Sequence, residues 1–470
     1  MRGNHRDMSR LRAVTIAEGH STAELIEIID PGTGVPVGRV PMTDPAELDR
    51  KVRRANHIQP EWARTPVGER AGSLRSAAAL LREHVRELAQ CNHAETGRPP
   101  SEAEEGVLAG ASTLEQYAEL GPLHRGKSLQ GDDDAIDLMV WEPRGVVVAL
   151  TPWNDPVAVS CGLLGAAVVT GNAVIYKPSE RAPHTGALLG ELLARALPEA
   201  VLQTVQGDGT VGALLAARSD VDVVAHVGST AAGRSIAASV AATGAKALLE
   251  NGGNDALVVD AGVDPVWAAE QAALGAFANV GQICVAVERI FVHVEVAETF
   301  IAALAIEAKS LSPAPLVDRR HRAHVHAHVR DALDRGAEAI VGGAIPDGDG
   351  AHYPATVLTH CDPTMRVMRE ETFGPVAPVR VVDSFDQGLA EAAADEYGLA
   401  ATVLTPSMAN AQRAWRELPV GTVKINAVFG GAPGGAAHPH GASGSGYGYG
   451  PELLDEMSQT KAVHLRPAPR

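Results

Sequence analysis

The feature that most constrains the fold is an alternation of short β-branched runs and helical stretches between residues 145 and 253. Runs such as VVVAL (146–150) are typical of buried parallel strands. Each run is followed by a turn and then by a stretch with helical spacing, such as TGALLGELLARAL (185–197). This β-α-β-α-β order predicts a doubly wound parallel sheet. A second alternating series over about 255–430 predicts a second α/β domain, so the expected fold class is α/β.

Length and charge limit what such a chain does. The 470 residues are too many for one core, so we expect two or three domains. A hydrophobic fraction of 45% excludes bulk disorder, and a net charge of −17 argues against a nucleic-acid partner. The polar start resembles no signal peptide, and the apolar stretch 163–176 is shorter than the ~20 residues of a membrane helix. We therefore expect a cytoplasmic protein with no membrane segment.

Metal binding is not predicted from the cysteines or the histidines. The four cysteines, at positions 91, 161, 284 and 361, are too far apart for a metal clip and too few for a disulfide framework. The run HRAHVHAHVR places His321, His324 and His328 on one helix face. Because a metal site needs converging, supported ligands, we interpret this run as a solvated helix face.

Polar side chains follow two of the predicted strands, at the sheet edge where doubly wound proteins bind ligands. Asn154 follows the first of these strands and is a suitable side-chain donor for an oxyanion, although a plain turn residue explains it as well. Lys177 and Glu180 follow the next strand. They suit the hydroxyl groups of a ribose, and equally suit a solvated loop with a surface charge pair.

Two glycine turns lead from a strand into a helix. GDGTVG (207–212) fits the loose context of a phosphate-binding turn, but it is weak evidence alone. VGSTAAG (227–233) offers free backbone N–H groups and Ser229, which fits either a pyrophosphate cradle or an ordinary serine-capped helix.

Two further residues carry possible chemistry. Glu250 ends a predicted strand before a glycine pair, where a carboxylate can serve as a general base or simply lie at the surface. Cys284 follows the dipeptide GQ by one residue. A lone cysteine is most often a small buried hydrophobic residue, so nothing intrinsic distinguishes Cys284 from the other three.

The order and spacing of these signals are far more specific than any one of them. TPWN, KPSE, the two glycine turns, ENGG, GQICV, EETFGPV (370–376) and YGLAA (397–401) follow one another in an order that resembles the aldehyde dehydrogenase superfamily. The resemblance runs from DPGTG near residue 30 to SQTKAVHL at the C-terminus. It implies a hydrolytic, NAD-dependent oxidoreductase, with NADP as a possible second cofactor.

The resemblance also implies residue roles. Cys284 is expected to be the nucleophile, Glu250 the general base, and Asn154 the side-chain half of an oxyanion hole. A carboxylate at Glu180 binds a ribose 2′-hydroxyl and repels a 2′-phosphate, which favours NAD. The expected cofactor contacts are Trp153, Lys177, Ser179, Glu180, Gly209, Gly212, Gly228, Ser229, Glu371 and Phe373.

Departures from the family pattern concern the substrate side. Asn251 replaces a usual leucine, Leu163 a frequent lysine, and Asp155 a usual aromatic residue, and the glycine-rich tail is shorter and lacks its lysine. The expected substrate pocket contains Asp155, Val159, Gly162, Ile283 and Val285. Small side chains there predict a wide tunnel and a medium-sized or aromatic aldehyde, while Asp155 favours a cationic aminoaldehyde instead.

The resemblance divides the chain into three parts. The expected NAD-binding domain covers 1–126 and 144–252, the catalytic domain 253–457, and a small β oligomerisation element 127–143 and 458–470. Because a lone hairpin is unstable in water, we expect a homodimer or homotetramer. Two alternatives remain: a relative that passes its acyl group to coenzyme A, and a non-catalytic scaffold of the same fold.

Overall fold

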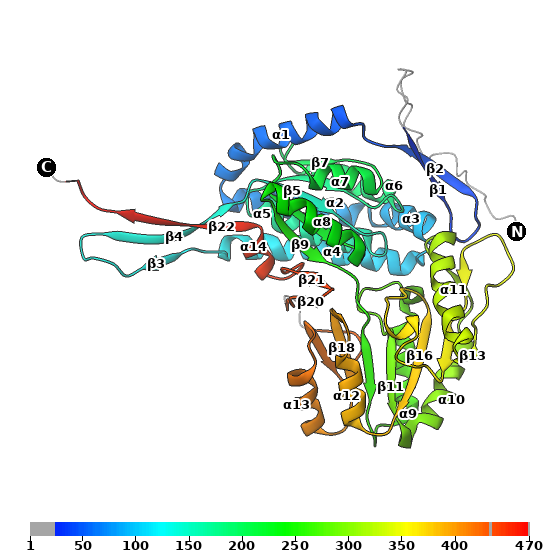
Figure 1. The fold of residues 1–470 in the computed structure, drawn as a ribbon. Helices are drawn as coiled ribbons and strands as arrows, with labels where there is room; N and C mark the ends of the chain where they lie inside the picture. Colours follow the sequence, from blue (N-terminus) through cyan, green and yellow to red (C-terminus); the bar gives the residue numbers. More distant parts are fainter. Residues whose placement is uncertain (1–23, 432–434, 469–470) are drawn as a thin grey trace, which may run out of the picture.

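The first alternating series forms a six-stranded sheet. The computed structural model describes residues 24–431 and 435–468, and Figure 1 shows this sheet in the upper part of the molecule. The order is β21-β9-β8-β5-β6-β7, with only β21 antiparallel to its neighbour. The strands are β5 (Val146–Leu150), β6 (Ala173–Lys177), β7 (Leu202–Thr204), β8 (Val223–Val227), β9 (Lys246–Glu250) and β21 (Gly444–Ser445).

Helices cover both faces of this sheet, as a doubly wound fold requires. One face packs on α2, α4, α5 and α6, and the other on α1, α7 and α8. Asp44 caps α1 by accepting a hydrogen bond from the Glu47 backbone N–H at 2.8 Å. The helices are α1 (Pro45–Arg64), α2 (Val67–Glu83), α3 (Val85–Thr96), α4 (Pro100–Leu120), α5 (Pro156–Val169), α6 (Pro183–Arg195), α7 (Gly209–Ala216) and α8 (Thr230–Thr243).

The second series forms a seven-stranded sheet in the lower part of Figure 1. Its order is β13-β15-β16-β11-β10-β18-β19, and only β13 runs antiparallel. Helices α9 and α10 cover one face, and α11, α12 and α13 cover the other. The elements are β10 (Ala256–Val259), α9 (Pro265–Phe277), β11 (Arg289–His293), α10 (Val294–Ser310), α11 (Arg319–Asp334), β13 (Glu338–Val341), β15 (Thr356–Thr359), β16 (Val376–Val382), α12 (Phe385–Ala393), β18 (Ala400–Leu404), α13 (Met408–Glu417) and β19 (Thr422–Ile425).

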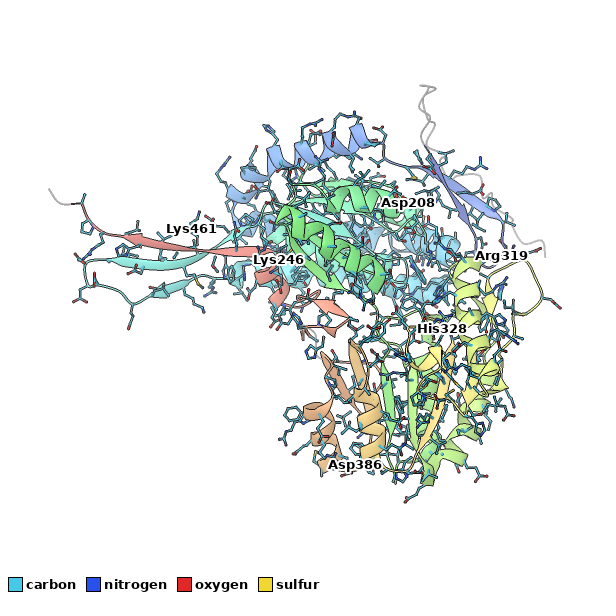
Figure 2. All side chains as sticks on the ribbon, in the orientation of Figure 1. Asp208, Lys246, Arg319, His328, Asp386 and Lys461 are labelled. Carbon is cyan, nitrogen blue, oxygen red and sulfur yellow. The ribbon has the colours of Figure 1, made fainter. Side chains whose placement is uncertain are left out.

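A third sheet projects from the body as an arm (Figure 1). It consists of β3 (Lys127–Leu129), β4 (Ile136–Pro143) and β22 (Ser458–Leu465), all antiparallel. Lys461, labelled on the arm in Figure 2, pairs with Glu142 of the neighbouring strand. Leu129 and Ile136 of the arm are exposed, at 46% and 57%, whereas the apolar side chains of residues 138–141 are half-buried.

The chain returns to the first domain before it reaches the arm. Strand β21 joins the first sheet beside β9, and α14 (Glu452–Glu456) places Leu453 and Leu454 in the first core. This differs from the expected boundary at residue 457, which assigned the whole stretch to the second domain. The return brings a C-terminal segment against the end of β9, next to Glu250.

Short strand pairs complete the structure. A hairpin of β1 (Leu25–Ile29) and β2 (Pro36–Pro41) precedes α1. Two smaller pairs are β12 (Ala314–Pro315) with β14 (His352–Tyr353) and β17 (Tyr397–Gly398) with β20 (His440–Gly441). Over residues 24–431 and 435–468, no helix is both long enough and apolar enough to cross a membrane.

Candidate active site

Three chemically capable side chains lie where the two domains meet. Asn154 follows β5, Glu250 ends β9, and Cys284 lies between a short 3₁₀ turn (Ala278–Gly281) and β11. Asn154 and Glu250 lie at the same edge of the first sheet, because parallel strands present their carboxyl ends at one edge. Cys284 comes from the second domain, in the loop before β11. The backbone of Cys284 lies close to the Gly253 turn, where an added Cβ would come within 2.8 Å of the Cys284 carbonyl oxygen.

The Cys284 side chain is accessible to solvent, whereas Cys161 and Cys361 are buried. Because Cys284 has solvent-accessible surface, a substrate can reach it. Many protein atoms nevertheless lie around the sulfur. Burial by these atoms, together with the carboxyl groups of Asp255, Glu250 and Glu371, raises the pKa of the thiol to about 12. The sulfur therefore carries its proton at neutral pH and needs a base to become a nucleophile.

Glu250 has the properties of that base. Its Oε1 accepts a hydrogen bond from the Gly448 backbone N–H at 2.8 Å. The pKa of the carboxyl is raised to about 7, because the effect of burial exceeds the opposing effect of the hydrogen bond from Gly448. A carboxyl group that titrates near neutral pH both accepts and returns protons under working conditions.

The Asn154 side chain is held against the segment that carries Cys284. Its Nδ2 donates to the Gln282 backbone carbonyl oxygen at 3.0 Å, and the backbone carbonyl oxygen of Asn154 accepts from Arg98 Nη1 at 3.3 Å. A primary amide has two N–H donors, so one remains for an oxyanion beside the sulfur. The Gln282 side chain fixes the same segment by accepting from the Val317 backbone N–H at 3.0 Å.

The expected nucleotide contacts surround the ends of β6 and β8. Lys177 is 6% exposed and donates to the Pro178 carbonyl oxygen, and burial lowers its pKa. Ser179 accepts from the Arg181 backbone N–H, and Glu180 is half-buried. Ser229 caps α8 by accepting from the Ala232 backbone N–H at 3.3 Å, as in the ordinary interpretation of this turn.

The glycines of the first turn leave the start of α7 open, whereas in the second turn an added Cβ would meet the His226 ring at Gly228 and the Asn251 side chain at Gly233. Helix α7 begins at Gly209 behind Asp208, whose side chain accepts from the Thr210 backbone N–H. An added Cβ at Gly209 would meet nothing within 4 Å, and one at Gly212 would meet only the Lys177 stem, at 3.9 Å. A negatively charged group therefore has free access to the α7 N-terminus.

The loop that carries Glu371 and Phe373 is held from two sides. Glu371 accepts from the Gly253 backbone N–H at 3.0 Å, and burial raises its pKa to about 7. Glu288 accepts from the Thr372 and Phe373 backbone N–H groups at 3.0 and 2.8 Å. These bonds hold Phe373 at a φ of 52°, and its ring packs edge-on against Trp153 with centroids 5.6 Å apart.

The histidines of α11 hold this loop from the helix side. His328, labelled in Figure 2, is fully buried and bonds Thr372 Oγ1 at 3.1 Å. His321 Nε2 lies 2.7 Å from the Phe373 carbonyl oxygen, and only His324 of the three is exposed. The interpretation of the whole run as a solvated face is therefore wrong for His321 and His328.

The expected substrate residues lie in different surroundings. Asp155 does not offer a free carboxylate, because its Oδ1 lies 3.0 Å from Arg98 Nη1. Val159, Ile283 and Val285 are half-buried. Gly162 is buried, and an added Cβ there would lie 3.8 Å from the ring of Tyr449.

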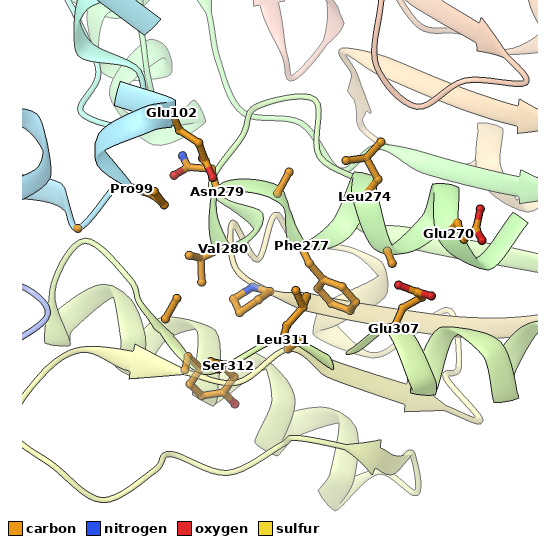
Figure 3. Close-up of a pocket in the computed structure, with 17 residues that line it drawn as sticks. Pro99, Glu102, Glu270, Leu274, Phe277, Asn279, Val280, Glu307, Leu311 and Ser312 are labelled. Atoms are coloured by element: carbon orange, nitrogen blue, oxygen red, sulfur yellow. The ribbon is translucent and has the colours of Figure 1, made fainter. Parts of the chain in front are cut away.

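Two hollows adjoin the site. Tyr449 lines a cleft of about 1080 Å³ between α4 and residues 421–423, 430–431 and 435–437, with Ser112, Thr113 and Gln116 on the helix side. A separate cavity of about 460 Å³ is shown in Figure 3, where Pro99 lies near Glu102 on one side and Phe277 and Leu311 lie near Glu307 on the other. None of the residues expected in the substrate pocket, and none of Asn154, Glu250 and Cys284, lines either hollow.

Sequence reasoning missed Glu288, Arg98 and Gln282. Each acts on the backbone of another functional segment, and such contacts leave no local pattern. The only signal for Glu288 is a charged residue within an otherwise apolar run before β11. Across the described residues, no group of three or more His, Cys, Asp or Glu side chains is arranged to hold a metal ion.

An exposed thiol with a carboxyl base and an amide donor, beside a doubly wound domain, defines a class of covalent, nucleotide-dependent oxidoreductases. Comparison with known proteins agrees. The family model described as "Aldehyde dehydrogenase family" matches residues 17–463. The chain is 33% identical over 463 residues to benzaldehyde dehydrogenase [NAD(+)] of Pseudomonas putida, covering 93% of this chain and 92% of the relative.

Solved structures give the same result. Lactaldehyde dehydrogenase from Escherichia coli superposes with a TM-score of 0.92 at 29% identity, covering 96% of this chain and 97% of the other. PnpE in complex with nicotinamide adenine dinucleotide has a TM-score of 0.91 at 28% identity, covering 94% of each chain. The chain belongs to the aldehyde dehydrogenase family.

Proposed function

We propose that this enzyme oxidises an aldehyde to the carboxylic acid with NAD, through a covalent intermediate on Cys284. The observation that carries the proposal is the accessible Cys284 thiol beside a carboxyl, Glu250, whose pKa is raised to about 7. The test is the formation of reduced cofactor and acid from a panel of aldehydes, with NAD and NADP in parallel. Failure of every aldehyde with both cofactors would overturn the proposal.

The side chains divide the chemistry between them. Glu250 removes the thiol proton, and the Cys284 sulfur attacks the aldehyde carbon. The new alkoxide accepts hydrogen bonds from Asn154 Nδ2 and the Cys284 backbone N–H. A dinucleotide held by the residues described below would accept the hydride from this carbon, which then stays on Cys284 as a thioester. Glu250 releases the first proton to solvent and takes a second one from a water molecule that attacks the thioester carbon. It returns this proton to the leaving sulfur, which releases the acid and restores the thiol.

The residues present suit a dinucleotide. The α8 N-terminus presents backbone N–H groups, and the nearby Thr230 hydroxyl is buried without a hydrogen-bond partner. Buried polar groups are rarely left unpaired, so this atom fits a ligand's phosphate or hydroxyl group. Lys177 and Glu180 would hold the adenosine ribose, Ser229 would meet the pyrophosphate, and Glu371 and Phe373 would position the nicotinamide end.

Replacing Glu180 with glutamine tests the preference for NAD. Glutamine still bonds a 2′-hydroxyl but no longer repels a 2′-phosphate. We expect the ratio of kcat/KM for NADP to that for NAD to rise by about tenfold, the effect of ~1.4 kcal/mol. Glu191→Gln on the exposed face of α6 is the matched control. An unchanged ratio would show that Glu180 does not face the ribose.

Replacing Asn154 with alanine tests the oxyanion hole. Loss of one oxyanion donor typically lowers kcat by about 10²–10³-fold. We expect that loss in steady-state kinetics, with little change in KM for the aldehyde. Asn56→Ala on α1, where the side chain is exposed, controls for loss of an amide as such. A fall of less than about threefold would contradict the assigned role.

We propose a medium-sized or aromatic aldehyde as the substrate. The small residues at Val159 and Gly162 support a wide tunnel, and one relative is named for benzaldehyde. The ion pair with Arg98 neutralises Asp155 and so argues against a cationic aminoaldehyde. Values of kcat/KM across the panel decide, and activity with acetaldehyde-sized compounds alone would overturn the wide-tunnel proposal.

The two alternatives predict different products. An acylating relative forms acyl-coenzyme A when coenzyme A is added, but it needs no water-activating base, so Glu250 favours hydrolysis. A non-catalytic scaffold forms no reduced cofactor with any aldehyde. Product analysis with and without coenzyme A distinguishes all three functions.

The arm supports the proposal of a homodimer or homotetramer, with residues 127–143 and 458–470 as the assembling element. Leu129, Ile136 and Leu465 are 46%, 57% and 53% exposed on an antiparallel sheet that projects from the body. A small sheet with apolar side chains in water is unstable unless another surface covers it. We expect light scattering at micromolar concentration to give at least twice the 48.9 kDa chain mass, and a monomer would contradict the prediction.

A further inference from the structure

His226 is a buried histidine that the proposed mechanism does not use. It lies near the end of β8, three residues before the cap of α8, and its side chain is 8% exposed. Both ring nitrogens are buried and neither has a hydrogen bond of good geometry, although the ring lies against the Ser229 backbone. Since buried polar groups are nearly always paired, an imidazole with two open nitrogens points to a ligand that completes it.

The position of His226 places it beside the expected nucleotide contacts. Leu150 of β5 pairs in register with His226 of β8 on one side and with Lys177 of β6 on the other. Side chains in register across parallel strands point to the same face, so His226 and Lys177 flank Leu150 on one face. That face carries α1, α7 and α8.

The surroundings of the ring suit an anion. Gly228 leaves room for it, because an added Cβ there would lie 2.7 Å from His226 Cε1. Thr230, in the first turn of α8, has a buried hydroxyl that also lacks a partner. His226 at the end of β8 and Thr230 in the first turn of the 14-residue α8 therefore each have a polar group without a partner. The helix dipole also favours a negatively charged group at this end of α8.

We propose that the His226 imidazole donates a hydrogen bond to a phosphate oxygen of the dinucleotide's pyrophosphate, as a specificity-determining residue of the cofactor site. This inference rests on the proposed function and deepens it. A neutral imidazole carries one N–H donor and one acceptor nitrogen, so one contact to phosphate and one to water would satisfy the ring.

The test compares ligands that differ only in the phosphates. Calorimetry on the full-length chain measures the Kd of ADP-ribose and of adenosine for wild type, His226→Phe and His226→Gln. Phenylalanine keeps the ring volume without a donor, whereas glutamine keeps a donor, so the inference survives if one variant misfolds. We expect His226→Phe to weaken ADP-ribose binding by about five- to tenfold, with His226→Gln intermediate and adenosine binding unchanged.

Three results would overturn the inference. ADP-ribose affinity within twofold of wild type in both variants would show no contact with the phosphates. Equal losses for adenosine and ADP-ribose would place His226 against the nucleoside instead. An equal loss in the control variant His57→Phe, an exposed histidine of α1, would make the effect non-specific. A wild-type chain that binds neither NAD nor ADP-ribose would instead overturn the proposed function, and this inference with it.

Discussion

Replacing Cys284 with alanine is expected to abolish aldehyde oxidation, with a loss in kcat on the order of 10⁶-fold. Removal of a covalent nucleophile costs about that much in other enzymes, because no remaining group forms the intermediate. The structure supports a loss of this size, since Cys91 is half-buried and Cys161 and Cys361 are buried. Reduced cofactor, followed by absorbance, measures the loss.

The matched control is Cys91→Ala on α3, which removes another thiol far along the chain from the site. It should leave kcat unchanged. The Cys284→Ala variant should still bind NAD, because none of the expected cofactor contacts is altered. Residual activity above about a hundredth of wild type would show that a different group attacks the aldehyde.

Replacing Glu250 with glutamine is expected to lower kcat by about 10²–10⁴-fold, the usual contribution of a general base. The wild-type pH profile carries the same information. Burial raises the pKa of Glu250 to about 7, so the basic form is lost as the pH falls through 7. We expect kcat to decline by about tenfold per pH unit well below that value and to level off above it.

Glu298→Gln, an exposed position on α10, is the matched control and should leave both kcat and the profile unchanged. The two roles of Glu250 separate in a rapid-mixing experiment. If the residue acts chiefly on water, the variant forms one equivalent of reduced cofactor per site and then stops. A wild-type profile with no inflection between pH 6 and 8 would contradict the assignment of Glu250 as the base whose pKa lies near 7.

The first sheet was predictable from local sequence, because a strand buried on both faces leaves a run of β-branched residues and a helix start leaves its cap. Asp44 caps α1, and Ser229 caps α8, which is one of the two interpretations that its turn allowed. The proposed catalytic residues could not be grouped from local sequence, because Asn154, Glu250 and Cys284 are far apart in the chain. Their convergence follows from the resemblance to a known family, and no spacing rule would have found it.

What the sequence could not predict depends on contacts between distant segments. His328 is buried because α11 packs against the loop around Thr372, and nothing in a run of histidines reveals that neighbour. The pairing of Asp155 with Arg98 joins the start of α5 to the turn before α4. Glu288 is functional only because two backbone N–H groups of a distant loop point at it.

The return of the C-terminal segment to the first sheet links catalysis to quaternary structure. Gly448, which donates to Glu250, lies between β21 and α14, and the chain continues within ten residues into β22 of the arm. α14 is anchored in turn by Lys246, which pairs with Glu456. In the proposed oligomer, only the short segment between Gly448 and β22 separates the arm from the proposed base Glu250. We therefore expect dissociation of such an oligomer to shift the acid limb of the pH profile before any secondary structure is lost.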